Sequence, residues 1–131
     1  MIALDTNVLV RFLVDDDPSQ CRKARDLVKK CVSGDTPILI PEVVLCEVVW
    51  VLRRAYRFGR EEIIDVLQKL VSSHGIVLDT PEIATDAMEM FRSGKGDLAD
   101  YLILCRSKAA GALKVATFDK TLLGTQGFFS P

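Results

Sequence analysis

Acidic side chains at a few separated positions are the residues of this chain best suited to chemistry. Asp5 and Asp119 each follow a short apolar run that is typical of a buried strand. Glu47 interrupts an otherwise apolar stretch, and Asp97 and Asp100 flank the start of a segment with a helical pattern. Hard divalent ions such as Mg²⁺ and Mn²⁺ prefer oxygen ligands and bind through a few carboxylates, water and substrate phosphate. The acids therefore point to a carboxylate-bound metal and to phosphodiester chemistry.

The histidine and cysteine content narrows the alternatives for catalysis. His74 is the only histidine, so a mechanism that needs a His dyad or several imidazole ligands is excluded. The four cysteines form no Cys-x-x-Cys pair, and we expect them to be reduced and structural. Any chemistry must therefore rely on carboxylates.

Each acid also has an ordinary structural explanation. Asp5 and Asp119 could cap the turns or helices that follow them, and Asp97 with Asp100 imitates a capping box. Glu47 is harder to explain, because burying an ionised carboxylate without a partner is costly. We expect it to meet an arginine, to be protonated, to reach water at an edge, or to hold a cation. A structural ion pair and a metal explain Glu47 equally well.

The elements that must position these acids alternate between strands and helices. Apolar runs predict four strands, and the tail could add a short edge strand; the four are Ile2 to Leu4, Pro37 to Ile40, Ile76 to Leu78 and Lys114 to Phe118. The predicted helices are Val8 to Val14, Asp17 to Gly34, Pro41 to Tyr56, Arg60 to Ser73, Thr80 to Arg92 and Asp97 to Ala110. Such alternation implies right-handed crossovers between parallel strands. We predict an α/β fold, a three-layer α/β/α sandwich with a mainly parallel sheet of four to five strands, and a site at the carboxyl ends of the strands.

Length and composition describe an ordinary globular chain. The 131 residues suit one domain, and no linker or repeat divides them, so we expect a single domain over residues 1–131. Apolar residues make up 49% of the chain, which hints at a surface that a partner covers. No stretch is long and apolar enough for a bilayer, and the first residues lack a secretory signal, so we expect a cytoplasmic protein.

The overall charge does not indicate a nucleic-acid partner. The net charge is −1, whereas phosphate binding usually shows itself as a basic excess. Basic residues nevertheless gather in two groups, Arg22, Lys23, Arg25, Lys29 and Lys30, and Arg53, Arg54, Arg57 and Arg60. Most such runs are solvated helix faces, and contact with RNA is the alternative for either group.

Four segments in a fixed order resemble the PIN-domain family. They are Leu4 to Leu9, Glu47 within its apolar helix, Asp97 to Ile103, and Ala116 to Lys120. The similarity spans nearly the whole chain, and the order of the opening D-T-N and the closing T-F-D makes it specific. The small size without further domains is similar to that of the VapC-type toxin ribonucleases of type II toxin-antitoxin systems.

The resemblance implies a set of metal ligands. The family's acidic quartet falls on Asp5, Glu47, Asp100 and Asp119, with Asp97 as an additional acid. In the family these acids hold one or two divalent ions, Mg²⁺ or Mn²⁺, that activate water to cleave RNA. The resemblance leaves open whether Asp119 touches the metal directly.

Supporting residues and partners also follow from the resemblance. Asn7, Thr6 and Thr117 are expected to support the ligands, and Arg11 and Lys95 to contact the RNA backbone. The implied partners are an RNA substrate (tRNA, rRNA or mRNA), a second copy in a homodimer, and a cognate antitoxin. The antitoxin would cross a groove between the first helices and the predicted helical hairpin.

Three other functions fit part of the pattern. A housekeeping PIN nuclease for RNA processing, or a phosphatase-like hydrolase, would keep the fold and the metal. A response-regulator-like module would bind Mg²⁺ and signal without catalysis, although such modules usually carry two acids after the first strand, where this chain has Asp5 alone. A PIN domain that only binds a partner is the third alternative, but all the matching acids are present.

Overall fold

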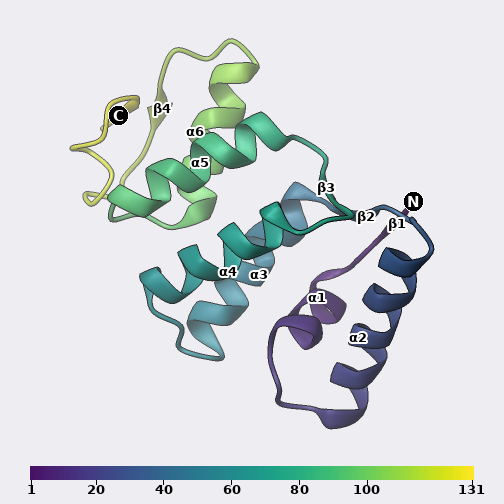
Figure 1. Cartoon of the computed structure of the whole chain (residues 1–131). Helices are drawn as coiled ribbons and strands as arrows, with labels where there is room; N and C mark the ends of the chain where they lie inside the picture. Colours follow the sequence, from purple (N-terminus) through teal and green to yellow (C-terminus); the bar gives the residue numbers. More distant parts are fainter. The chain divides into compact units, whose positions relative to one another are not determined.

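Strands and helices alternate along the chain in the computed structural model, which describes residues 1–131 (Figure 1). The chain divides into two units, Met1–Asp79 and Thr80–Pro131, and each unit has its own strands. All five strands pair in parallel, and six helices connect them. The predicted α/β class with parallel strands is therefore confirmed.

The first unit is built on a three-stranded sheet in the order β1-β2-β3. Its strands are β1 (Ile2–Ala3), β2 (Ile38–Ile40) and β3 (Ile76–Leu78). Its helices are α1 (Thr6–Leu13), α2 (Pro18–Ser33), α3 (Glu42–Arg54) and α4 (Arg60–Ser72). The central strand is completely buried at Ile38 and Ile40, as expected for a parallel strand with neighbours on both sides.

Local signals explain where the first two helices begin. The Asp17 side chain accepts a hydrogen bond of 3.0 Å from the Gln20 amide, and Pro18 occupies the first helical position of α2. Helix α1 begins at Thr6, two residues earlier than predicted, because Asp5 caps it directly. The end of β1 and the start of α1 are thus joined at one acidic residue.

The second unit pairs two helices with two short strands. They are α5 (Pro81–Ser93), α6 (Leu98–Ala109), β4 (Val115–Ala116) and β5 (Phe128–Phe129). The tail does add an edge strand, β5, as predicted. Strand β4 is shorter than its prediction, and Phe118 beyond it is 86% exposed. The core of this unit is formed by Phe91, Leu98, Tyr101 and Leu104, all at most 1% exposed.

Two further features concern the whole chain. None of the helices combines the length and the apolar character needed to cross a membrane. None of the four cysteines forms a disulfide; Cys21 and Cys31 are buried, whereas Cys46 and Cys105, on which the prediction of structural thiols rested, are only half-buried.

Candidate active site

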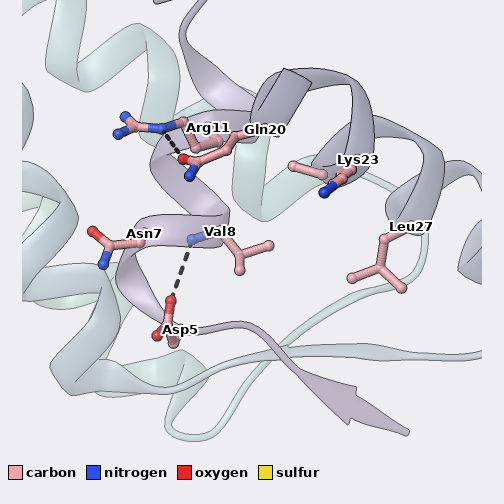
Figure 2. Close-up of a pocket in the computed structure, with 8 residues that line it drawn as sticks. Asp5, Asn7, Val8, Arg11, Gln20, Lys23 and Leu27 are labelled. Carbon is pink, nitrogen blue, oxygen red and sulfur yellow. Dashed lines mark hydrogen bonds between the residues drawn. The ribbon is translucent and has the colours of Figure 1, made fainter. Parts of the chain in front are cut away.

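Asp5 lies where β1 passes into α1. Its Oδ1 accepts a hydrogen bond of 3.2 Å from the Val8 amide, so the capping role considered for this residue is real. Its second carboxylate oxygen makes no hydrogen bond and remains available to a ligand. Asp5 also lines a pocket of about 340 Å³ between α1 and α2 (Figure 2). The pocket is lined by Asp5, Asn7, Val8, Arg11, Gln20, Lys23, Ala24 and Leu27.

Arg11 on the same helix is held by a hydrogen-bond network that the sequence did not reveal. Its Nε donates to Gln20 Oε1 at 2.7 Å, and its Nη1 donates to Asp16 at 3.2 Å and to the Tyr56 hydroxyl at 2.9 Å. Tyr56 in turn donates to Asp16. Tyr56 lies 45 residues away from Arg11 along the chain, so no local pattern could have predicted the contact.

The network also shifts the ionisation of its members. Desolvation alone would lower the pKa of Arg11, but the charge of Asp16 and the hydrogen bond to Tyr56 outweigh it, and the net shift is upward. The hydrogen bond to Asp16 is the main reason why the pKa of Tyr56 is raised. Arg11 therefore stays charged and Tyr56 stays protonated over the range in which proteins work.

Glu47 is exposed on α3, so the prediction that apolar side chains surround it was wrong. An exposed carboxylate needs no buried partner, and the alternative that Glu47 holds a cation stays a prediction. Val43 and Trp50, about one helical turn away on either side, are 63% and 59% exposed on the same face. The buried residues of the helix lie on other faces and are Val44, Leu45, Val48, Val49 and Leu52.

Asp97 and Asp100 lie at the start of α6, as predicted. Asp100 Oδ2 accepts a hydrogen bond of 2.8 Å from the Asp97 amide, which is the backward half of a capping box. The Asp100 side chain is partly buried. Desolvation, and then the nearby charge of Asp119, raise the pKa of Asp100.

Asp119 follows β4 and is held by two threonines. Its Oδ1 accepts hydrogen bonds from the Thr121 amide at 2.9 Å and the Thr121 hydroxyl at 2.7 Å. Its own amide donates to the Thr117 hydroxyl at 3.0 Å. The hydrogen bonds from Thr121 lower the pKa of Asp119. The pKa values of Asp100 and Asp119 are thus shifted in opposite directions.

The glycine loop before α6 is packed against Asp100 and Tyr101. The Gly96 amide donates to the buried Tyr101 hydroxyl at 2.9 Å. A Cβ at Gly96 would lie 2.6 Å from Leu122 Cδ2 and 3.0 Å from Asp100 Oδ2, so only glycine fits here without a shift. The sequence did not reveal this contact between Gly96 and Tyr101, although the G-K-G-D run marked the loop. Lys95 in this loop is exposed and makes no ion pair.

The predicted acids are divided between the two units. Asp5 and Glu47 belong to the first unit, and Asp97, Asp100 and Asp119 belong to the second, where Asp100 accepts a hydrogen bond from the Asp97 amide and feels the charge of Asp119. No group of three or more His, Cys, Asp or Glu side chains is arranged to hold a metal ion. Asp100 and Asp119 nevertheless supply interacting carboxylate oxygens, which fit the donor chemistry that Mg²⁺ and Mn²⁺ prefer.

Comparison with known proteins identifies the family. The family model described as PIN domain matches residues 2–126, and the chain therefore belongs to the PIN domain family, as the resemblance predicted. The chain is also similar to a VapC ribonuclease of Aquifex aeolicus (strain VF5). The two are 22% identical over 120 residues, which cover 92% of this chain and 88% of that protein.

Proposed function

We propose that this chain is a metal-dependent endoribonuclease that acts in the cytoplasm as the toxin of a type II toxin-antitoxin pair. Membership of the PIN domain family and the similarity to a VapC ribonuclease support this proposal. The observation that carries it is the pair Asp100 and Asp119, two carboxylates close enough for the charge of one to raise the pKa of the other. Such a pair is unfavourable by itself and is stabilised by a cation.

The proposed ligands are Asp5, Glu47, Asp100 and Asp119, with Asp97 as an additional acid. Hydrogen bonds orient three of them before any ligand arrives. Asp5 and Asp119 each use Oδ1 for backbone or threonine donors, and Asp100 uses Oδ2. The remaining oxygens are those proposed to bind metal. Mg²⁺ or Mn²⁺ would supply a water of lowered pKa and neutralise charge on the phosphate.

Other residues have supporting roles in this proposal. Thr117 holds the backbone of Asp119, and Thr6 and Asn7 follow Asp5 in the first turn of α1. Arg11 and Lys95 are the cations proposed to contact the RNA backbone. Arg11 is held rigidly by its network, whereas Lys95 is exposed on a loop, so we expect Arg11 to contribute more per contact.

Protein partners are part of the proposal as well. Val43 and Trp50 expose apolar surface on α3, and exposed aromatic and aliphatic side chains are typical of protein interfaces. We propose that a cognate antitoxin binds the chain and that the chain forms a homodimer. Sedimentation of the purified chain tests the second point, and a monomer at micromolar concentration would contradict it.

The decisive experiment is an RNA cleavage assay with purified protein free of any partner. Structured RNA, including tRNA, is incubated with Mn²⁺, with Mg²⁺ or with EDTA, and the wild type is compared with Asp5→Asn and Asp100→Asn. Cleavage is expected only with metal and only by the wild type. Asp86→Asn, which changes an exposed acid on α5 outside the proposed set, is the matched control and should cleave normally.

A different result of the same assay would contradict the nuclease proposal. If the wild type and the variants are equally inert while the wild type still binds Mn²⁺, the chain is a binding module and the nuclease proposal fails. Circular dichroism of each variant shows that loss of cleavage is not loss of folding.

A further inference from the structure

The pocket between α1 and α2 combines cations with an apolar wall. Side chains of both helices line it: Asn7, Val8 and Arg11 of α1, and Gln20, Lys23 and Leu27 of α2. In Figure 2, Val8 points toward Lys23 and Leu27, whereas Asn7 and Arg11 point to the other side of α1. Ala24 completes the apolar wall, and Asp5 stands at the start of α1. The volume of about 340 Å³ is at the small end of the range for ligand pockets.

The polar groups of this pocket have hydrogen-bonding capacity to spare. Arg11 uses Nε and Nη1 within its network, which leaves Nη2 without a partner. The Lys23 ammonium makes no ion pair, and the Asn7 amide makes no hydrogen bond. The unpaired Lys23, the Asn7 amide and Arg11, whose charge is shared with Asp16 outside the pocket lining, thus surround one small pocket whose single carboxylate is Asp5. Such a set suits an anion bound beside Asp5.

We propose that this pocket binds one nucleotide of the RNA substrate. Arg11 and Lys23, which lie apart in the pocket (Figure 2), contact the phosphates on either side of this nucleotide, and the apolar wall of Val8, Ala24 and Leu27 contacts the base. Asp16, Gln20 and Tyr56 are positioning residues, because they fix the guanidinium of Arg11 rather than touch RNA. The proposal rests on the ribonuclease function proposed above, since it names where the substrate of that enzyme lies.

The spacing along α1 supports a phosphate near the proposed cleavage site. Asn7 and Arg11 are four residues apart and therefore lie on one face, with a rise of roughly 6 Å between them. Asp5, the proposed metal ligand, lies just before the first turn of the same helix. A chain of phosphates that enters at Asp5 can therefore continue to Arg11 without leaving this face of α1.

The test is RNA binding in the absence of cleavage. The Asp100→Asn protein in EDTA is titrated against a fluorescein-labelled single-stranded RNA of twelve nucleotides and mixed sequence, at several salt concentrations. Introducing Arg11→Met or Lys23→Gln into the Asp100→Asn protein is expected to weaken RNA binding about tenfold. Either change should also make the plot of the logarithm of the RNA association constant against the logarithm of the salt concentration less steep by about 0.7. Lys108→Gln, which removes an exposed charge of α6 outside the pocket and outside both basic groups, should leave the slope nearly unchanged.

A second pair of variants tests the apolar wall with matched charge. Leu27→Asp introduces a carboxylate into the pocket, whereas Val32→Asp introduces the same charge on the same helix outside it. The two side chains are 37% and 40% exposed, so both variants should fold. Leu27→Asp is expected to weaken RNA binding at least fivefold more than Val32→Asp. Equal affinities would overturn the nucleotide subsite.

The role of Tyr56 is tested by a double-mutant cycle. Tyr56→Phe should weaken RNA binding about threefold while the salt slope stays as it is, because Arg11 keeps its charge but loses its fixed position. The same substitution should have no effect on binding in the Arg11→Met protein. An equal loss in both backgrounds would show that Tyr56 does not act through Arg11.

The nuclease proposal and the nucleotide subsite can fail independently, and the two assays show which of them has failed. If cleavage requires metal and Asp100 but the pocket variants bind RNA like their controls, the nuclease proposal stands and the subsite falls. If the pocket variants lose RNA binding as expected but the wild type never cleaves, the subsite stands and the nuclease proposal falls.

Discussion

The two units of the chain hold their acidic residues in different surroundings. In the first unit, Asp5 lines a pocket together with the cations Arg11 and Lys23. In the second unit, Asp100 is partly buried beside another carboxylate, Asp119, and both are tied to nearby backbone donors. The pocket of the first unit therefore attracts anions, whereas the two carboxylates of the second unit attract cations.

The contrast between the two units explains how a chain with a net charge of −1 can still attract both RNA phosphate and a metal ion. Affinity for phosphate does not require a basic surface if a few cations are concentrated and held in place. Equally, a metal does not require many ligands from one unit if two carboxylates are already constrained. Burial and, after it, the charge of Asp119 raise the pKa of Asp100, so we expect the ionised Asp100 to make the free protein less stable at neutral pH and a bound cation to offset that cost.

The largest effect is expected from the acids of the second unit. Asp100→Asn or Asp119→Asn should reduce metal-dependent RNA cleavage by more than about a hundredfold, because even outer partners of metal ligands usually account for tenfold to a hundredfold. Initial rates under saturating Mn²⁺ measure the effect. Rates within threefold of the wild type would mean that the carboxylate pair is structural, and the contrast between the units would lose its functional meaning.

The glycine loop beside that pair should be the most sensitive structural position. A Cβ at Gly94 would lie 1.9 Å from the Tyr101 hydroxyl oxygen and 2.9 Å from the Met90 carbonyl oxygen. Gly94→Ala is therefore expected to lower the free energy of unfolding by about 1–3 kcal/mol, as overpacking usually does. Thermal unfolding in EDTA measures the change. Gly124→Ala, where nothing lies within 4 Å, is the control, and equal melting temperatures would contradict the packing described for this loop.

The capping role of Asp5 should give a smaller change in the first unit. Asp5→Ala removes the acceptor for the Val8 amide and should cost about 1 kcal/mol of unfolding free energy. Asp5→Asn keeps an acceptor and should cost much less, yet it is expected to abolish cleavage. Chemical unfolding and the cleavage assay together separate the two roles. If both variants unfold alike, Asp5 does not stabilise α1 through its side chain.

The smallest effect concerns the pH dependence of stability in the absence of metal. Because the pKa of Asp100 is raised in the folded protein, the folded state binds this proton more tightly than the unfolded state does. The resulting stabilisation is present at acid pH and is lost as the pH rises through the folded pKa. Asp100→Asn should therefore become more stable relative to the wild type as the pH increases from about 3 to 7.

Unfolding in EDTA across this pH range measures the difference between the two proteins. Asp86→Asn serves as the reference for loss of an exposed charge. With saturating Mn²⁺ at pH 7, the wild type should become more stable than Asp100→Asn, because only the wild type retains both carboxylates. A difference that is constant with pH would show that Asp119 and burial do not perturb Asp100 in solution.

Local patterns predicted most of the elements correctly. The Asp17-Pro18 pair located the start of α2, and the apolar period after Arg60 predicted α4. These signals succeed because caps and amphipathic faces involve residues within about one helical turn. The start of α1 and the length of β4 were less accurate, since Asp5 proved to be the cap itself and β4 pairs with β5 over only two residues.

The residues of the site were predicted more easily than their surroundings. The acid types and their order sufficed to select Asp5, Glu47, Asp97, Asp100 and Asp119 and to suggest the family, which the comparison confirmed. Their roles as metal ligands stay a prediction. The exposure of Glu47 was missed, because a helix with apolar residues on several sides does not reveal which sides its neighbours cover.

What the sequence determined by itself was therefore local: the α/β alternation, the caps and the identity of the acids. The tertiary structure decided which distant groups meet. It brought Tyr56 to Arg11 and Asp119 toward Asp100, and it packed Gly96 on Tyr101. The physical reason is that hydrogen bonds act over roughly 3 Å and charge interactions over roughly 10 Å in space, whereas residues far apart along the chain become neighbours only when the helices pack.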